Sequence, residues 1–281
     1  MRHPRHPRSA RAALRRHRRR GHARLRGAHH AERVLKRVSK SALLRMFWRS
    51  LFLQASWNPR GMQNLGFAYA MGPALDELYP DRAVRAKAAE RHLEFFNCQP
   101  YMAAAILGGA ARVEERVAAG EAEAADVSQF KSTLGPPFAA LGDGFFWLAL
   151  RPAAALVAAE TAPYVGLWSV LVFLGLYNVV HVSARVWMFL SGYKRAEGIV
   201  ESLSHMHYAS GTPLLKACGA ALAGAMAARA VLSAAFGPHP ETAPAFGALI
   251  VAAFFFLPKL GVTRSVYIGL LCGLALGARF L

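Results

Sequence analysis

Residues 163–182, PYVGLWSVLVFLGLYNVVHV, form a run of twenty without a formal charge. As an α-helix, rising about 1.5 Å per residue, this run would be roughly 30 Å long, the thickness of the hydrocarbon core of a bilayer. A helix on the surface of a soluble domain normally keeps one polar face, whereas this run is apolar on almost every side. It therefore predicts a membrane-spanning helix. The central helix of a large soluble bundle is the alternative that length leaves open.

The overall composition agrees with a membrane protein. Of the 281 residues, 54% are hydrophobic, and the mean hydropathy is +0.24. Cys98, Cys218 and Cys272 lie far apart, so there is neither a disulfide framework nor a metal-ligand spacing. We also find no glycine-rich phosphate loop and no nucleophile with an evident base. The sequence thus predicts no catalytic residues, no metal and no cofactor.

The positive charge is concentrated at the N-terminus. Residues 1–40 hold 15 Lys or Arg and one Glu, so +14 of the net +18 lies there and the other 241 residues carry +4. This arm has few aliphatic residues, and we expect it to be disordered on its own. It could lie on anionic lipid headgroups, bind nucleic acid, or be upstream sequence translated from a start codon placed too early. Nucleic acid is disfavoured because no aromatic residue stands among the arginines to stack on bases. The arm also lacks the apolar run of a secretory signal.

Residues 41–57, SALLRMFWRSLFLQASW, have the spacing of an amphipathic helix. Arg45 and Arg49 lie on one face, and an aromatic, apolar face would suit the cytoplasmic membrane interface. A helix packed on a soluble core is the alternative, because periodicity does not separate the two. The apolar face comprises Leu44, Phe47, Trp48, Leu51, Phe52 and Ala55.

Residues 56–73 predict two turns that bracket a short helix, one turn at Asn58-Pro59 and the other at Gly72-Pro73. Beside Trp57, three side-chain amides could bind a sugar hydroxyl or cap neighbouring helix ends, and capping is the favoured interpretation. These amides belong to Asn58, Gln63 and Asn64.

Residues 81–97 again have helical spacing, with His92 next to the apolar stripe. A lone histidine there is more often a hydrogen-bonded structural residue than a catalyst. Residues 98–111 are apolar but too short to span a bilayer as a helix, which favours a buried or re-entrant segment. Residues 112–133 are charged and polar, and we expect them in water.

Gly142, Asp143 and Gly144 stand at the mouth of the apolar segment 134–159, which also contains Arg151. Charged groups so close to a membrane core need partners. Asp143 and Arg151 are about two helical turns apart, which is too far along the axis for direct pairing. An intramembrane aspartyl protease is disfavoured, because no later apolar segment supplies the second aspartate that its chemistry requires.

Asn178 and His181 lie within the central run, and polar groups at such depth usually face other protein, as interhelical hydrogen bonds or along a transport path. In segment 213–236, Ala220, Gly224 and Ala228 recur every four residues and predict close helix packing in lipid.

Two further apolar segments follow at 245–258 and 265–278. The basic residues after the central run and around 259–264 place those loops, and the N-terminus, in the cytoplasm. Together the patterns predict an all-α fold: a polytopic helical membrane protein with amphipathic and re-entrant helices in its N-terminal half.

Several stretches in this order resemble the IID membrane component of the mannose/fructose/sorbose family of sugar phosphotransferase systems (PTS). The resemblance covers about residues 41–203. It fades beyond them, where the family has a longer polar segment, and residues 1–40 lie outside the family pattern. We therefore expect a basic arm at 1–40 and a IID-like membrane domain at 41–281. The family usually has Thr-His where this chain has Cys98 and Gln99. The matching stretches are residues 47–58, 62–71, 91–101, 135–143, 146–152 and 192–200.

The resemblance implies a non-catalytic permease subunit in a bacterial inner membrane. Such a subunit pairs with a IIC subunit in a hetero-oligomer and translocates a mannose-type hexose, which cytosolic IIB phosphorylates after receiving the phosphoryl group through IIA. The resemblance also implies that a set of mainly polar residues lines the IIC interface or the sugar path, with the interface favoured. The set is Trp57, Asn58, Gln63, Asn64, His92, Asn97, Gly142 and Asp143.

Two other functions stay open. The shortened C-terminal half could mean an orphan IID-like protein that has lost transport and reports sugar or phosphotransfer status to a partner. Alternatively, the chain could be a structural membrane protein that tethers lipid or nucleic acid through its arginine-rich arm.

Overall fold

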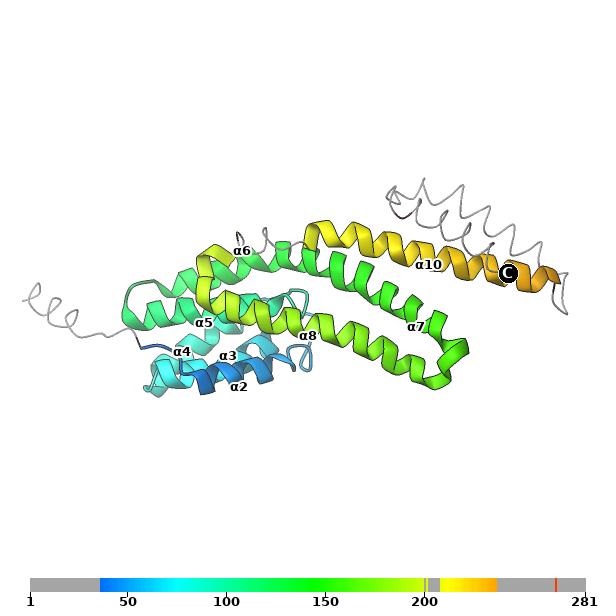
Figure 1. The fold of residues 1–281 in the computed structure, drawn as a ribbon. Coiled ribbons are helices and arrows are strands. Elements are labelled where there is room, and N and C mark those ends of the chain that lie inside the picture. The colour runs from blue at the N-terminus through cyan, green and yellow to red at the C-terminus, as the bar shows by residue number, and fades with distance from the viewer. Residues whose placement is uncertain (1–35, 200, 202–207, 237–265, 267–281) are drawn as a thin grey trace, which may run out of the picture.

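The computed structural model describes residues 36–199, 201, 208–236 and 266. Within them the regular secondary structure is helical (Figure 1), apart from two isolated β-bridges at Met62. The predicted segment at 245–258, nearly all of that at 265–278 and most of the basic arm lie outside the described residues. In chain order the helices are α2 (Lys40–Ser50), α3 (Asn64–Leu78), α4 (Arg82–His92), α5 (Ala103–Ala119), α6 (Ala124–Gly142), the π-helix η1 (Asp143–Leu150), α7 (Arg151–Val165), the 3-10 helix η2 (Gly166–Trp168), α8 (Ser169–Arg195), the 3-10 helix η3 (Ala196–Gly198) and α10 (Tyr208–Phe236).

The molecule has a cluster of short helices at one end and long helices that extend from it (Figure 1). Helices α2 to α5 gather at one end. The line formed by α6, η1 and α7 runs away from them, α8 returns beside it, and α10 lies along α7.

Helix α2 is shorter than predicted and leaves its aromatic face open. Its N-cap is Ser39, whose Oγ accepts a hydrogen bond from the Ala42 amide at 3.1 Å, and turns replace the helix after Ser50. Ala42 and Met46 are buried, whereas Trp48 is 59% exposed. Leu44, Leu51 and Phe52 are exposed too. A soluble core would cover these side chains, so this face is suited to lipid or to another protein.

Helix α3 contradicts the predicted turn at Gly72-Pro73. It passes through Pro73 and ends at Leu78. Proline inside a helix removes one backbone hydrogen bond and costs roughly 3 kcal/mol. Here Met71, Ala74 and Leu75 are all buried in the core, and this packing on both sides of Pro73 keeps the helix continuous.

Helices α5 and α6 confirm one expectation and overturn another. Residues 103–111 at the start of α5 are all buried, as predicted for that apolar segment. Farther along the same helix, Glu114 and Glu115 are also completely buried, and Lys131 of α6 is 1% exposed. The expectation that residues 112–133 lie in water is therefore wrong for these three side chains, because each has a polar partner inside the fold.

The uncharged run at 163–182 is not one helix. It contains the end of α7, the turn η2 and the first half of α8, so its first residues form the tip of a helical hairpin. Pro163 lies in the last turn of α7, and Gly166 follows with φ +59, a left-handed value that favours glycine. Chain reversal at this glycine explains why the run does not continue as a straight helix.

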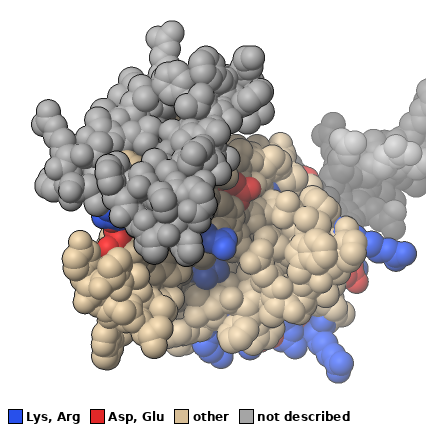
Figure 2. Space-filling view, turned by 90° about the vertical axis from the view of Figure 1, so that its right-hand side faces the viewer, with Lys and Arg blue, Asp and Glu red and all other residues tan. Residues whose placement is uncertain are grey.

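The hairpin is nevertheless the apolar part of the molecule. The helical run from Ala124 to Arg195 contains an 18-residue window with a mean hydropathy of 1.8, none of which is buried, and its length and composition suffice to cross a membrane. Seen from the end where the hairpin tip lies, the coloured surface is mostly uncharged, and Lys and Arg side chains gather mainly toward its edges (Figure 2).

Two helix contacts depend on small residues. A Cβ atom on Gly192 of α8 would lie 2.0 Å from the Ala105 carbonyl oxygen of α5, and one on Gly108 would lie 2.2 Å from the Phe189 oxygen. On the other side, α10 packs on α7 and η1, and its predicted small-residue stripe is confirmed as buried. That stripe is Ala220, Gly224 and Ala228.

Replacing Gly192 by alanine should separate α5 from α8. The added Cβ cannot fit against the α5 backbone, and overpacking of this kind costs about 1–3 kcal/mol. We expect a lower thermal unfolding midpoint in detergent. Gly175→Ala on the same helix is the matched control, because a Cβ there meets nothing within 4 Å. Equal midpoints for the two variants would contradict this account.

Candidate functional site

Two of the predicted site residues from elsewhere in the chain contact the six residues before α5, Asn97 to Met102, called here the 97–102 segment. Gln63 and Gly142, which come from different parts of the chain, both contact this segment. Asn97 itself is exposed, and so is Asp143 beside Gly142.

Gln63 fixes the segment through its side-chain amide. Its Nε2 donates to the Cys98 carbonyl oxygen at 2.7 Å, and the Cys98 amide donates to its Oε1 at 3.1 Å. The Gln63 backbone amide also donates to the Phe96 oxygen at 2.9 Å. Gln63 is only 2% exposed, so its side-chain amide holds the backbone of the segment from within the core.

The two asparagines close the turn that precedes α3. Asn58 Nδ2 donates to Asn64 Oδ1 at 3.1 Å, and the Gly61 amide donates to Asn58 Oδ1 at 2.8 Å. Asn64 Nδ2 donates to the Leu93 oxygen at 2.6 Å, which ties the turn to the end of α4. These bonds agree with the capping interpretation. Trp57 lies at the start of this turn and is 52% exposed.

Gln99, at the position where the family usually has histidine, orders the turn that leads into α5. Its Oε1 accepts hydrogen bonds from the amides of Tyr101 at 2.8 Å and Met102 at 3.0 Å. Both residues precede Ala103, the first residue of the helix. Gln99 is 2% exposed, so a buried side chain fixes the backbone of the segment at this place.

Gly142 allows α6 to approach the segment closely. A Cβ at this position would lie 2.5 Å from Met102 Cγ and 2.7 Å from Gln99 Cβ. The π-helix η1 begins at the next residue, Asp143. Short π-helical segments are frequent at functional sites because they turn side chains away from the regular helical face.

Tyr101 joins the segment to η1 and α8. Its ring centroid lies 4.9 Å from that of Phe146 and 5.9 Å from that of Trp147. Its ring stacks on His181 at 4.4 Å, and its hydroxyl is 3.1 Å from that of Tyr177. His181 therefore faces protein, as expected.

Asn178 lies on the exposed side of α8. The expectation that it faces other protein is therefore not met within the described part of this chain.

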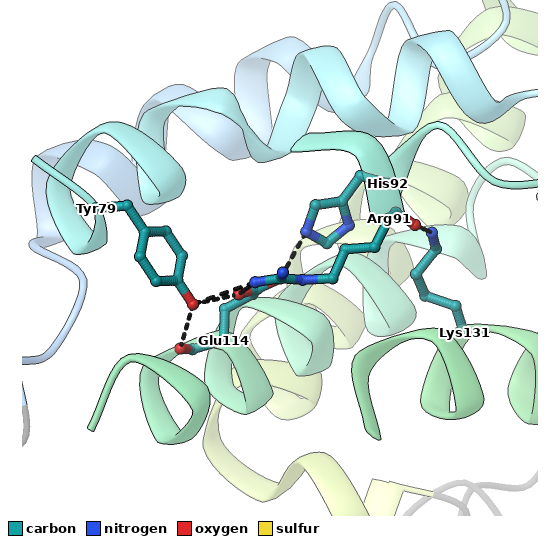
Figure 3. Close-up of polar contacts among 5 residues, drawn as sticks. All are labelled: Tyr79, Arg91, His92, Glu114 and Lys131. Atoms are coloured by element: carbon teal, nitrogen blue, oxygen red, sulfur yellow. Dashed lines mark hydrogen bonds and ion pairs between the residues drawn. The ribbon is translucent and has the colours of Figure 1, made fainter. Parts of the chain in front are cut away.

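His92 belongs to a separate buried cluster around Glu114 (Figure 3). His92 Nε2 lies 2.9 Å from Glu114 Oε1, and Arg91 Nε donates to the same oxygen at 2.6 Å. Tyr79 donates from its hydroxyl to Oε2 at 2.7 Å. Lys131 Nζ donates to the Arg91 carbonyl oxygen at 2.6 Å. His92 is fully buried, so these contacts agree with the structural interpretation of this histidine.

The cluster holds a charged carboxylate beside a neutral imidazole. Burial alone would raise the pKa of Glu114, but the hydrogen bonds from His92 and Arg91 outweigh burial and lower it to about 2. Burial lowers the pKa of His92 despite the nearby carboxylate. Burial and Glu114 together raise the pKa of Tyr79. At pH 7, therefore, a neutral His92 donates its Nε2 hydrogen to an ionised Glu114.

Sequence reasoning missed Glu114 although the sequence contains a signal for it. Glu114 follows Leu107 and Ala111 at helical spacing, so it continues the buried stripe of α5. A carboxylate in such a stripe needs partners, and Arg91 and His92 supply them. No group of three or more potential metal-binding side chains occurs in the part of the chain that the structure describes.

Replacing Glu114 by glutamine should destabilise the protein at pH 7. Removing one member of a buried ion pair leaves Arg91 without its partner and costs about 3–5 kcal/mol. The pKa of Glu114 is lower in the folded protein than its ordinary value of 4.5. Its contribution is therefore complete above pH 4.5 and is lost as pH falls toward 2.

Thermal midpoints in detergent, measured for both proteins across this range, test the prediction. The difference between them should shrink as the pH falls. A difference that is constant with pH would show that Glu114 does not act through its charge.

Comparisons with known proteins point to one family. Residues 37–237 match the family model of the PTS system mannose/fructose/sorbose family IID component. The mannose-specific EIID component of Escherichia coli (strain K12) is 38% identical over 170 residues, which are 60% of each chain. The fructose permease IID component of Bacillus subtilis (strain 168) is 35% identical over 170 residues, 60% of this chain and 62% of that protein. The alignment thus spans less than two thirds of these relatives.

A similar solved structure matches a larger share of the chain than these relatives do. It is the cryo-EM structure of the mannose transporter ManYZ in complex with microcin E492, with a TM-score of 0.56 and 29% identity. The match covers 83% of this chain and 93% of the matched chain. A further structure, described only as that of a membrane protein, has a TM-score of 0.63 and 36% identity, and the match covers 68% of this chain and 71% of that one.

Proposed function

This chain belongs to the IID component of the mannose/fructose/sorbose family of the PTS, and from that premise we propose that it pairs with a IIC subunit to translocate a mannose-type hexose. Cytosolic IIB phosphorylates the sugar after receiving the phosphoryl group through IIA. The observation that carries the proposal is the convergence of the family-like stretches around Gln63, Gly142 and Trp147 on the 97–102 segment.

The surface of the chain supports a partner within the membrane. Helix α2 exposes an aromatic face, and η2 and the first half of α8 expose large apolar side chains, among them Leu167 at 89% and Val179 at 68%. Apolar surface of this extent is stable only against lipid or another protein. The resemblance to a mannose transporter structure supports a hetero-oligomer with a IIC subunit.

We also propose the orientation. The charged ends of α5, α6 and α8 lie at the same end of the molecule, opposite the hairpin tip (Figure 1). Lys194 and Arg195 belong to this end. Because basic residues favour the cytoplasmic side, this end faces the cytoplasm of a bacterial inner membrane. The chain then crosses more than once, its N-terminus is cytoplasmic, and the basic arm at 1–40 lies on anionic lipid before the IID-like domain at 41–281.

Purification from native membranes tests the pairing. With a tag at the C-terminus and extraction in mild detergent, we expect a IIC subunit in stoichiometric amount, identified by mass spectrometry. Cells should also take up hexose in a manner that requires both the chain and IIB. A chain that purifies alone and whose deletion leaves uptake unchanged would contradict the proposal and favour the regulatory function.

The role of the exposed polar residues can be tested at Asp143. Its side chain has no polar partner among the described residues, so Asp143→Asn should leave the amount of protein in the membrane unchanged. If Asp143 lines the sugar path, the apparent KM for hexose should rise at least about 5-fold, the loss expected for roughly 1 kcal/mol of binding. If it lines the interface, copurification of IIC should fall instead.

Glu90→Gln provides the control, because Glu90 is an exposed carboxylate on α4. It should change neither the KM nor the copurification. Asp143→Asn with the same behaviour as this control would remove Asp143 from the site.

A further inference from the structure

Arg185 is a buried cation in the second half of α8. It is 6% exposed, and within the described residues no carboxylate is paired with it. Instead its Nη2 donates to two backbone oxygens, that of Ser50 at 2.9 Å and that of Pro100 at 3.2 Å. Burying a charge without a counter-ion is unfavourable, so its presence beside the 97–102 segment calls for a reason.

The two acceptors belong to parts of the chain that are distant in sequence. Ser50 is the last residue of α2, and the carbonyl groups at the end of a helix lack intrahelical partners and carry partial negative charge. Pro100 lies in the 97–102 segment. One side chain of α8 therefore connects α2 to the candidate site, across 135 and 85 residues of sequence.

Arg185 is also the last of three residues on one face of α8 that contact the segment. Tyr177, His181 and Arg185 are spaced by four residues and so lie on the same side of the helix. The first two contact the hydroxyl and the ring of Tyr101, and the Arg185 Cζ atom lies 5.7 Å from the centre of that ring. The segment is thus attached to α8 through both its backbone and its aromatic side chain.

The packing of α8 does not rest on Arg185 alone. Helices α5 and α8 also meet backbone to backbone at Gly108 and Gly192. Replacing a buried charge with an apolar side chain of similar volume is often neutral for stability. The planar guanidinium group of arginine can donate to oxygens of two segments at once. A role in orienting the candidate site therefore explains why position 185 is an arginine.

We propose that Arg185 is a positioning residue that sets the orientation of the 97–102 segment, and through it of Asn97 and Tyr101, for sugar translocation. It acts through the Pro100 carbonyl oxygen and the Tyr101 ring and does not touch the sugar. This inference rests on the function proposed above, and it adds a specific residue of α8 that no family-like stretch contains.

Two substitutions test the inference in the assembled complex. Arg185→Met removes both hydrogen bonds. Arg185→Lys keeps the charge but lacks the planar fork of donors, so it bonds the two backbone oxygens less well. Hexose uptake is measured in cells that contain the chain with the IIC, IIA and IIB proteins of its own system, and the amount of chain in the membrane is determined in parallel. Lys194→Met, an exposed cation on the same helix, is the control.

We expect the apparent KM to rise about 10-fold for Arg185→Met and less for Arg185→Lys, with membrane amounts close to those of the wild type and of the control. Uptake that falls only in proportion to the amount of chain, at unchanged KM, would show that Arg185 is merely structural and would overturn the inference. An unchanged KM at an unchanged amount would also overturn it. If the wild-type chain supports no uptake, the proposed function fails and this inference falls with it.

Discussion

The close contact between α5 and α8 is the constraint on which the rest of the structure depends. Gly108 and Gly192 remove the side chains that would keep the two backbones apart. With the helices in this contact, the ends of α5 are also fixed: Tyr193 donates to Glu115 near one end, and Tyr101 meets Tyr177 near the other. The 97–102 segment therefore takes its place from a helix-packing contact that lies outside the candidate site.

A second constraint is electrostatic, and it acts at the opposite end of α5. Glu114 is balanced by Arg91, and Glu115 by Arg112. Glu114 thereby ties α4 to α5, and Glu115 accepts a hydrogen bond from the amide of Val38, which precedes α2. Charges are thus concentrated where α5, α6 and α8 have their polar ends, and residues 163–182 at the tip of the hairpin carry no formal charge. This division of the chain into a charged end and an apolar end is what a bilayer requires.

The sequence predicted the features that depend on local pattern. The helical class, the small-residue stripe of α10 and the buried start of α5 follow from composition and spacing. The position of the hairpin tip did not follow, because one left-handed glycine reverses a run that hydropathy treats as continuous. The continuation of α3 through Pro73 and the burial of Glu114 depend on neighbours far along the chain. For the candidate site, sequence named Gln63 and Gly142, but only the fold shows that they meet the same segment.

The hydrogen bonds of the candidate site also limit what this chain can contribute to a sugar path. The amides of Asn58, Gln63 and Asn64 are already bonded within the chain, so they orient backbone and offer few free groups. Among the predicted residues that the structure describes, Trp57, Asn97 and Asp143 are exposed. A hexose carries several hydroxyl groups, and buried hydroxyls need hydrogen-bond partners. If the chain pairs with a IIC subunit as proposed, most of those partners should come from that subunit, and this chain mainly provides rigid, oriented backbone beside the path.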